Sequence, residues 1–266
     1  MTERDDTQHQ VEIVTQFAKQ ALPFTRLPGH LTAIQLLLEL SRVTREDHVL
    51  DVACGPRLVA CECAKLAKFV TGIDVTASML DQARSRQRDM GLTNLSWDLG
   101  IVAPLPYASQ TFSVVLTRYS FHHFLDPHAV LAEMIRVCQP GGVVLIADVA
   151  LPAGKVEAYD HVEKLRDPSH AQALSYEAWD DLLVRSGLHN PQRSSYTAEM
   201  ELEQQLAASC PNPGDAETIR EIFRNDLGVD ALGVGAHLVD RAIHFSYSHL
   251  RVCRFQIYGR KVDGAG

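Results

Sequence analysis

The segment 49–57, which reads VLDVACGPR, constrains the fold of this chain more than any other feature of the sequence. The apolar and β-branched residues between Val49 and Val52 are typical of a buried parallel strand. Small residues follow from Ala53 to Gly55, and they let backbone N–H groups approach a ligand where the next helix begins. The segment therefore predicts a strand that opens onto a nucleotide-type ligand, although such turns also occur in α/β proteins that bind nothing there.

Later segments strengthen this prediction. Residues 68–83, KFVTGIDVTASMLDQA, indicate a second strand that ends at Asp74 and is followed by a helix. Asp74 lies about twenty residues after Asp51, the distance at which an acid in a βαβ unit accepts hydrogen bonds from ribose hydroxyls. Residues 112–127, FSVVLTRYSFHHFLDP, indicate a strand that runs into a histidine-rich turn, and residues 139–149, QPGGVVLIADV, indicate a further strand.

Helical and strand patterns alternate along this part of the chain. Strands are expected near 48–53, 69–74, 94–98, 112–118 and 142–149, and helices near 9–21, 29–43, 56–67, 77–90 and 127–138. Such alternation predicts a parallel sheet with helices on both faces and a ligand beyond the carboxyl ends of the strands. After residue 150 the pattern changes to helices near 154–166, 176–186 and 199–229, and then to a hairpin and closing strand over 234–261.

In the order and spacing of VLDVACG, GID, LPY, FHHFLDP and PGG, the chain resembles the class I S-adenosylmethionine-dependent methyltransferases, most closely the ubiquinone and menaquinone C-methyltransferase branch. The resemblance implies an α/β fold with a doubly wound, mainly parallel seven-stranded sheet, helices on both faces and a small helical cap. It divides the chain into N-terminal helices that lid the cofactor (1–45), a cofactor-binding core (46–150), a helical cap and substrate region (151–232), and C-terminal strands (233–266).

The resemblance also implies a cofactor site. Residues Ala53 to Gly55 are expected to line the methionine moiety, Asp74 to bind the ribose, and Val75 and Met79 to flank the adenine. The full set expected to bind S-adenosylmethionine is Asp51, Ala53, Cys54, Gly55, Asp74, Val75, Met79, Val102 and Thr117. Two positions depart from the family pattern: Arg57 stands where the family has a glycine, and Ile101 stands where it has an acid for the adenine amino group.

Candidate catalytic residues follow from the chemistry. Methyl transfer is an in-line displacement, so the protein must position the acceptor, exclude water and supply a base when the acceptor atom carries a proton. By resemblance to relatives with an FEHF turn, His122 is expected to face the substrate, whereas His123 is expected to be a buried imidazole bonded to backbone. In the segment 161–170, HVEKLRDPSH, Arg166 suits an acceptor carboxylate or phosphate and His170 a general base. A solvated, charged helix end is the alternative for this segment.

Composition and motifs exclude several functions. The net charge of −8 and the absence of a Lys/Arg cluster argue against nucleic acid as a partner. The N-terminus is polar and acidic and the apolar stretches are short, so neither a secretory signal nor a membrane span is expected. The six scattered cysteines indicate reduced thiols and a cytoplasmic location. Histidines from separate segments, such as His122, His170 and His237, give no short-spaced metal-ligand pattern, so no metal is expected.

The sequence thus predicts an S-adenosylmethionine-dependent methyltransferase with a small-molecule acceptor. The alternative is a methyltransferase-fold protein with another task, such as cyclisation or ligand sensing, because Arg57 and Ile101 depart from the family. A nicotinamide-dependent oxidoreductase is less favoured, since the chain has neither a GxGxxG loop nor a Tyr-x-x-x-Lys pair. Which of O, N, S or C is methylated stays open, as does the oligomeric state, with a homodimer among the alternatives.

Overall fold

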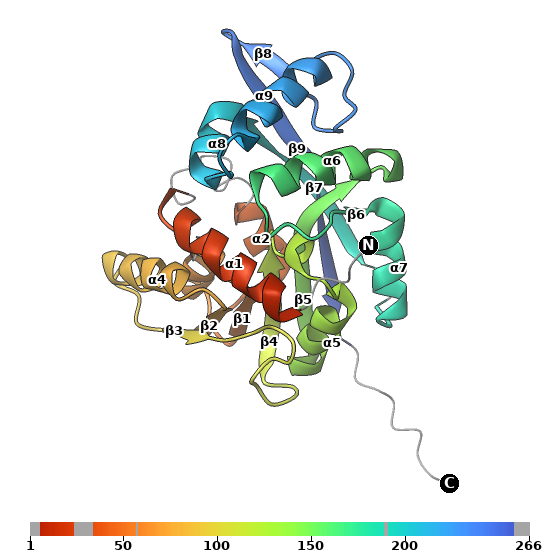
Figure 1. The fold of residues 1–266 in the computed structure, drawn as a ribbon. Helices are drawn as coiled ribbons and strands as arrows, with labels where there is room; N and C mark the ends of the chain where they lie inside the picture. Colours follow the sequence, from red (N-terminus) through yellow and green to blue (C-terminus); the bar gives the residue numbers. More distant parts are fainter. Residues whose placement is uncertain (1–5, 24–33, 57, 189–190, 258–266) are drawn as a thin grey trace.

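A single twisted sheet forms the centre of the molecule (Figure 1). The computed structural model describes residues 6–23, 34–56, 58–188 and 191–257. Along the sheet the strands follow the order β3-β2-β1-β4-β5-β9-β7. The first five of these are parallel: β1 (His48–Val52), β2 (Phe69–Asp74), β3 (Leu95–Leu99), β4 (Phe112–Arg118) and β5 (Cys138–Leu151).

Antiparallel strands complete the sheet beyond β5. Strand β9 (Ala242–Gln256) pairs with β5, and β7 (Gln192–Glu201) pairs with β9 at the edge. Two short strands, β6 (Leu174–Ser175) and β8 (His237–Val239), pair with β5 and β9. The mainly parallel α/β sheet is confirmed, but it has nine strands within the described residues, so the expected count of seven was too low.

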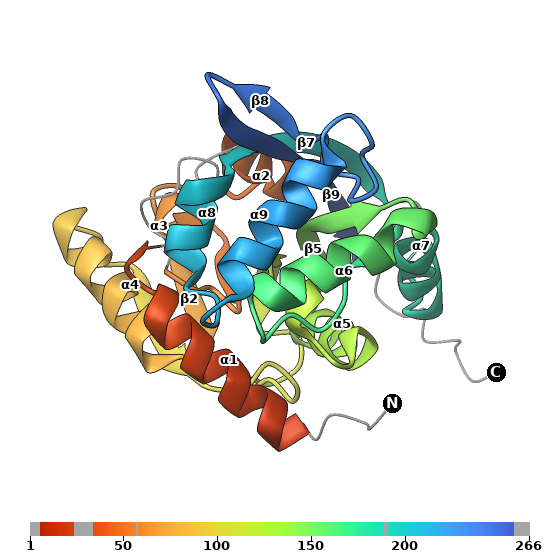
Figure 2. The same cartoon turned by 45° about the horizontal axis from the view of Figure 1, so that its top comes forward.

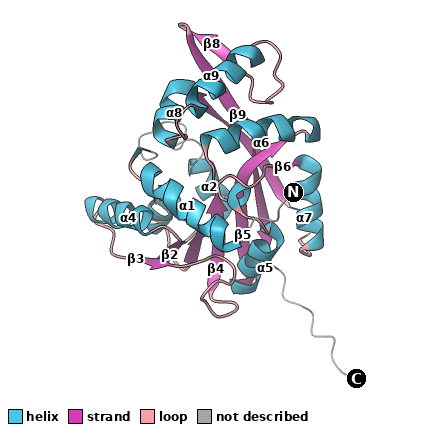
Figure 3. Cartoon of the chain, in the orientation of Figure 1, coloured by secondary structure: helices cyan, strands magenta, loops and turns pink. Residues whose placement is uncertain are grey.

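Helices cover both faces of this sheet, as Figure 3 shows by colour. They are α1 (Asp6–Gln20), α2 (Ile34–Ser41), α3 (Leu58–Ala64), α4 (Ala77–Asp89), α5 (Pro127–Val137), α6 (Ala153–Arg166), α7 (Tyr176–Arg185), α8 (Leu202–Ser209) and α9 (Asp215–Asp226). A 3₁₀ turn, η3 (Phe121–His123), follows β4. Helices α6, α8 and α9 lie together at one end of the molecule, and α1 contacts both α4 and α8 (Figure 2).

Local sequence explains where α5 begins and which face it buries. Asp126 caps the helix by accepting a hydrogen bond from the Ala129 N–H at 3.0 Å, and Pro127 occupies the first helical position, where its missing N–H is tolerated. The buried residues Val130, Leu131, Met134 and Val137 lie three or four positions apart and form one apolar stripe. This stripe packs α5 onto the sheet.

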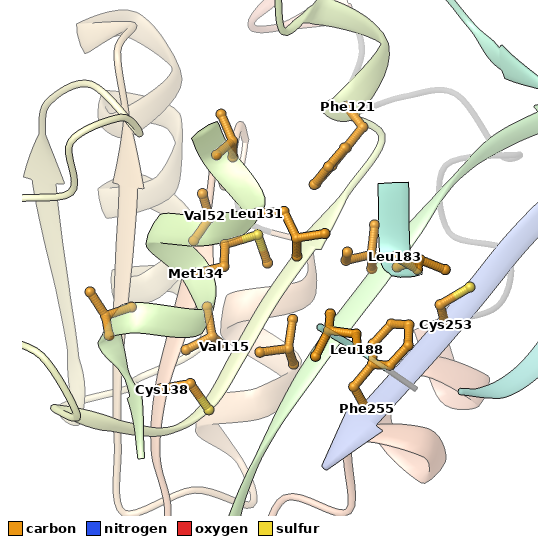
Figure 4. Close-up of a cluster of buried hydrophobic side chains, with 14 of the residues drawn as sticks. Val52, Val115, Phe121, Leu131, Met134, Cys138, Leu183, Leu188, Cys253 and Phe255 are labelled. Atoms are coloured by element: carbon orange, nitrogen blue, oxygen red, sulfur yellow. The ribbon is translucent and has the colours of Figure 1, made fainter. Parts of the chain in front are cut away.

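Two hydrophobic cores lie on opposite faces of the sheet, and a third lies under the cap. The first joins α5 and α7 to strands β1, β4, β5 and β9, and Figure 4 shows its side chains, including Val52, Val115 and Leu183, converging. The second lies under α2 and α3 and contains Val49, whereas the next residue of β1, Leu50, lies in the first core. This alternation along β1 is the period-two pattern of a strand buried on both sides. The third core joins α6, α8 and α9 to β7 and β9.

Strand β7 was not predicted. It lies inside the segment 151–232, where the sequence indicates only helices, and the helix expected from residue 199 begins at Leu202. The strand reads QRSSYTAEME, and although exposure alternates along it, only Ala198 and Met200 are buried, so the strand has few buried apolar positions. Its conformation instead depends on pairing with β9, some fifty residues later in the chain.

Candidate active site

A cavity of about 380 Å³, called here the first cavity, lies at the carboxyl ends of β1, β2 and β4. Its volume is in the usual range of small-molecule pockets, about 300–1,000 Å³. The walls come from the β1–α3 turn, the end of β2, the loop after β3, the end of β4 and the inner face of α1. The cavity therefore occupies the position that parallel α/β sheets use for ligands.

The β1–α3 turn shapes the floor of the first cavity. Ala53 (φ 53°) and Gly55 (φ 50°) both adopt left-handed backbone conformations. Such a conformation is strained for alanine, and strain of this kind gathers at ligand sites. The Cys54 N–H donates to Ile73 O at 3.0 Å and the Gly55 N–H donates to Asp74 Oδ2 at 2.8 Å, so β2 holds the turn in place.

Two buried carboxyl groups, Asp51 and Asp74, line the first cavity. Burial and, to a smaller extent, the charge of Asp74 raise the pKa of Asp51 to about 8, against a hydrogen bond from the Ala60 amide and the charge of Arg118, which lower it. Burial also raises the pKa of Asp74, although the backbone N–H groups of Thr76 and Gly55 donate to its carboxylate. Both acids would be stabilised by a ligand that brings a cation and hydroxyl donors.

A second cavity of about 70 Å³ adjoins the first. Phe17, Tyr119 and His123 line both, so these side chains lie between the two spaces. Its other walls come from the turn after β4, the middle of β5, the cap helices α6 and α8, and strands β7 and β9. The lining residues are Phe17, Tyr119, His122, His123, Asp148, Val149, Tyr159, Glu163, Arg166, Asp167, Met200, Gln205 and Tyr247.

The second cavity contains the hydrogen-bonded pair of His122 and Asp148. His122 Nδ1 lies 2.7 Å from Asp148 Oδ1. The Asp148 carboxylate also accepts backbone N–H bonds from Ser120 (2.8 Å), Phe121 (2.7 Å) and Val149 (2.7 Å). The carboxylate thus fixes the imidazole of His122, whose other nitrogen, Nε2, lies on the edge of the ring that faces away from Asp148.

Burial and charge act in opposite directions on this pair. Burial alone would lower the pKa of His122, but the charge of Asp148 and the hydrogen bond between them raise it above its usual 6.5. Burial alone would raise the pKa of Asp148, but His122 and the backbone N–H donors keep it below its usual 3.8. Asp148 is therefore an ionised, buried carboxylate that favours a proton on His122.

The other predicted catalytic residues have different surroundings. His170 is fully buried, with Nε2 2.7 Å from Asp160 Oδ1, lies outside the lining of both cavities, and has its pKa lowered by burial. Arg166 lines the second cavity, but its guanidinium donates to Glu163 Oε1 (3.0 Å) and Ser209 Oγ (2.8 Å). The catalytic roles assigned to His170 and Arg166 stay predictions.

The expectation for His123 is confirmed. Its ring is buried, and Nδ1 lies 3.1 Å from the backbone oxygen of Ser169. Burial and the neighbouring His122 together lower the pKa of His123 to about 3. His123 is therefore a neutral ring that forms part of the wall between the cavities.

The structure brings the predicted cofactor residues together at the first cavity, with one exception. Thr117 is buried below it, and its hydroxyl donates to Val52 O at 2.7 Å. Ile101 lies at the cavity and is 39% exposed, whereas Arg57 lies outside the described residues. The residues of the set that line the cavity are Asp51, Ala53, Cys54, Gly55, Asp74, Val75, Met79 and Val102.

Sequence reasoning missed several lining residues. Asp148 is an acid in the buried run VVLIADV, the same signal that identified Asp51 and Asp74, so it could have been found. His9 and Phe17 line the cavities from α1, and the helical spacing of that segment gave no indication of them individually. Gln205 carried no signal, because a glutamine in an amphipathic helix is ordinarily exposed.

Comparisons with known proteins identify the fold family. Residues 50–146 match the family model described as a methyltransferase domain. An uncharacterized methyltransferase of Bacillus subtilis, YcgJ, is 30% identical over 155 residues, which are 58% of this chain and 61% of that protein. The crystal structure of YcgJ aligns with a TM-score of 0.76 at 22% identity, covering 85% of this chain and 98% of that one. Residues 50–146 therefore match a methyltransferase domain, and the chain has the fold of the methyltransferases to which it is similar.

A ubiquinone/menaquinone biosynthesis C-methyltransferase of Bdellovibrio bacteriovorus is 29% identical over 180 residues, or 58% of this chain and 74% of that protein. The chain spans 61% of the length of YcgJ and of a second relative, the uncharacterized protein YafE of Escherichia coli. Among the described residues, no helix is both long and apolar enough to cross a membrane. The same part of the chain holds no cluster of three or more His, Cys, Asp or Glu side chains arranged for a metal ion.

Proposed function

We propose that this class I methyltransferase transfers a methyl group in line from S-adenosylmethionine to a small-molecule acceptor. The observation that carries the proposal is the adjacency of two cavities that share Phe17, Tyr119 and His123 in their walls. One cavity holds two buried acids beside a strained small-residue turn, and the other holds the His122–Asp148 pair. Two reactants bound in these cavities would thus lie next to each other, on either side of the shared side chains.

The residues of the first cavity fit S-adenosylmethionine. The Asp51 carboxyl, with its raised pKa, suits the ammonium group of the methionine moiety, and Asp74 suits the ribose hydroxyls. Met79 and Val102 supply apolar walls for the adenine. When bound, the cofactor supplies an electrophilic methyl group on a sulfonium centre. The N-terminal helix α1 covers the cavity with Ile13 and Phe17 and so helps to exclude water.

His122 is the proposed base. Asp148 holds the imidazole through Nδ1, so Nε2 is the atom that takes a proton from an acceptor in the second cavity. Because the pKa of His122 is raised, the neutral imidazole becomes the major form only above its usual pKa of 6.5. Activity should therefore rise with pH through the raised pKa of His122.

The relatives support a small-molecule acceptor. The Bdellovibrio bacteriovorus relative is named as a ubiquinone/menaquinone biosynthesis C-methyltransferase. The size of the second cavity suits a small group, and the net charge of −8 disfavours a polyanion. All six cysteines are free thiols, which supports a cytoplasmic location.

The first test is calorimetric titration with S-adenosylmethionine and S-adenosylhomocysteine. We expect micromolar binding by the wild type and its loss in Asp74→Ala. Asp74→Asn, which keeps an oxygen for the Gly55 or Thr76 N–H, controls for damage to the turn. The matched control is Asp81→Ala on the exposed side of α4, which should bind like the wild type. No binding by the wild type would contradict the proposal.

A second measurement separates methyl transfer from cyclisation or ligand sensing. The wild type and His122→Asn are incubated with S-adenosylmethionine and a panel of small acceptors, and S-adenosylhomocysteine is quantified. Formation of S-adenosylhomocysteine that depends on His122 supports the methyltransferase. Binding of the cofactor without any turnover across the panel favours the alternatives.

A further inference from the structure

The second cavity contains a buried hydrogen-bond acceptor with no partner. Gln205, on α8, lines this cavity and is 2% exposed. Its Oε1 accepts no hydrogen bond from any described residue. Buried side-chain oxygens are nearly always paired, because an unpaired one loses its hydration without compensation. An orphan of this kind in the wall of a cavity indicates a ligand that completes it.

The orientation of the Gln205 amide follows from its neighbours. Gln205 Nε2 lies 3.5 Å from the Tyr247 hydroxyl, and that hydroxyl lies 3.5 Å from Glu163 Oε1. Tyr247 has one proton to donate, and the ionised Glu163 is acceptor-only, so the proton of Tyr247 is directed to Glu163. Gln205 must then present its N–H to the tyrosine oxygen. The amide oxygen is thus the atom left for a ligand.

A second hydroxyl in the cavity is available. Tyr159 lines the cavity from α6, and its hydroxyl makes no hydrogen bond within the described ranges of the chain. Unlike Gln205 Oε1, a phenolic hydroxyl both donates and accepts. A ligand hydroxyl matches the pair of Gln205 and Tyr159, because it can donate to the amide oxygen and also exchange a hydrogen bond with Tyr159.

Charge in the second cavity disfavours an anionic ligand. Glu163 already neutralises Arg166, whose remaining bond goes to Ser209. Asp148 and Asp167 also line the cavity, and the pKa values of Asp148 and Glu163 are both held below their usual ranges despite burial, so both are ionised. The lining thus has three carboxylates against two cationic groups, Arg166 and protonated His122, so a carboxylate or phosphate on the acceptor is disfavoured.

The size of the cavity limits what enters. A volume of about 70 Å³ is well below the roughly 300–1,000 Å³ of ordinary small-molecule pockets, so it admits an end group and not a whole multi-ring molecule. We propose that Gln205 is a specificity-determining residue that accepts a hydrogen bond from a hydroxyl group on the end of a neutral acceptor. The proposal rests on the proposed function, since it takes the second cavity as the acceptor site.

The test uses two pairs of small probes. Within each pair, one probe carries a hydroxyl group where the other carries a methyl group. Dissociation constants of phenol and toluene, and of cyclohexanol and methylcyclohexane, are measured by ligand-observed NMR with S-adenosylhomocysteine present. Benzoate serves as the anionic probe. In the wild type we expect the hydroxyl member of at least one pair to bind about tenfold tighter, the gain of one hydrogen bond. Benzoate should bind more weakly than either hydroxyl probe.

Variants assign that preference to Gln205. Gln205→Leu removes the amide oxygen at similar size and should reduce the tenfold preference to about twofold or less. Gln205→Met tests the same loss with an unbranched side chain if the leucine variant does not fold, and Gln205→Glu keeps an acceptor oxygen and should retain the preference. Gln204→Leu, on the exposed face of the same helix, is the matched control and should leave the preference unchanged.

The outcomes separate the two proposals. Calorimetry with S-adenosylhomocysteine is run on every variant, and absence of binding by the wild type counts against the proposed function. Binding of S-adenosylhomocysteine with equal affinity for the hydroxyl and methyl probes overturns the role of Gln205 and leaves the proposed function standing. Failure of all probes to bind while S-adenosylhomocysteine is bound also overturns it, as does a hydroxyl preference that survives in both Gln205→Leu and Gln205→Met.

Discussion

Replacement of Asp148 should damage both the fold and the proposed base. The carboxylate lies in the buried part of β5 and accepts backbone N–H bonds from Ser120, Phe121 and Val149. In Asp148→Ala these three donors lose their partner. A buried donor without a partner costs about 1–3 kcal/mol, so the sum is about 3–9 kcal/mol before water enters the enlarged cavity. The free energy of unfolding of a native protein is about 5–15 kcal/mol, so this variant should lose much of its stability.

Asp148→Asn separates the individual bonds. Its single oxygen can stay with the Ser120 and Phe121 N–H groups, while its NH₂ faces the Val149 N–H, so one donor is left unpaired at a cost of about 1–3 kcal/mol. The asparagine variant should therefore lie between the wild type and the alanine variant in the free energy of unfolding. Asp181→Ala, an exposed acid on α7, should change this free energy by no more than about 0.5 kcal/mol.

Urea unfolding, followed by circular dichroism at pH 7, measures these differences. The reasoning fails if Asp148→Ala is destabilised by less than about 1 kcal/mol, or if the asparagine variant loses as much as the alanine variant. If Asp148→Ala does not fold, the asparagine variant still decides the matter. It should fold, be less stable than Asp181→Ala, and lose the pH dependence of activity assigned to His122.

Further perturbations address the charges and the lid. The pKa of His122 is raised in the folded state, so the stability that this residue contributes is complete below about pH 6.5 and is lost as the pH rises through the folded pKa. The urea midpoint of the wild type should therefore fall with rising pH over this range. The midpoint of His122→Asn should not show this fall. Asp51, with its pKa of about 8, is mostly protonated at pH 7, so binding of the cofactor ammonium group should release a proton. Calorimetry in buffers of different ionisation enthalpy should detect this proton in the wild type and not in Asp51→Asn. Equal heats of binding in all buffers for the wild type would contradict this. Gln20→Leu removes the bonds from α1 to Asp167 Oδ2 (3.3 Å) and Ser209 O (2.8 Å) and should speed hydrogen exchange in α1, whereas Gln8→Leu should not.

The parallel half of the sheet could be predicted because its strands are buried on both faces. Runs such as VLDV and FSVVLT are continuous apolar patterns with small residues or acids at their ends, and such patterns are informative without tertiary contacts. Helices were found in the same way, with α5 predicted over 127–138 and observed over Pro127–Val137. Strand β7 was not predicted because only two of its ten residues are buried, and its conformation depends on pairing with β9.

The lining residues of the first cavity could be predicted from the sequence more readily than those of the second. The first is built from the ends of neighbouring parallel strands, so an acid at the end of each strand indicates the site directly. The second is built by tertiary packing of the turn after β4 against α6, α8 and β9. Charged residues of α6 suggested an anion site, but the i, i+3 spacing of Glu163 and Arg166 lets them bond each other instead.

This difference limits what the match to a methyltransferase domain says about the acceptor. The methyltransferase domain model matches residues 50–146, which hold the motif residues of the first cavity and, from the second, Tyr119 and the two histidines of the β4 turn. Asp148, Gln205 and Tyr247 follow that matched segment in the chain. A relative can therefore share the cofactor residues and the proposed base while holding a different set of groups around the acceptor. The chemistry of the acceptor must then be inferred from the cap residues of this chain, and among them the buried, unpartnered oxygen of Gln205 is the feature that most restricts the choice.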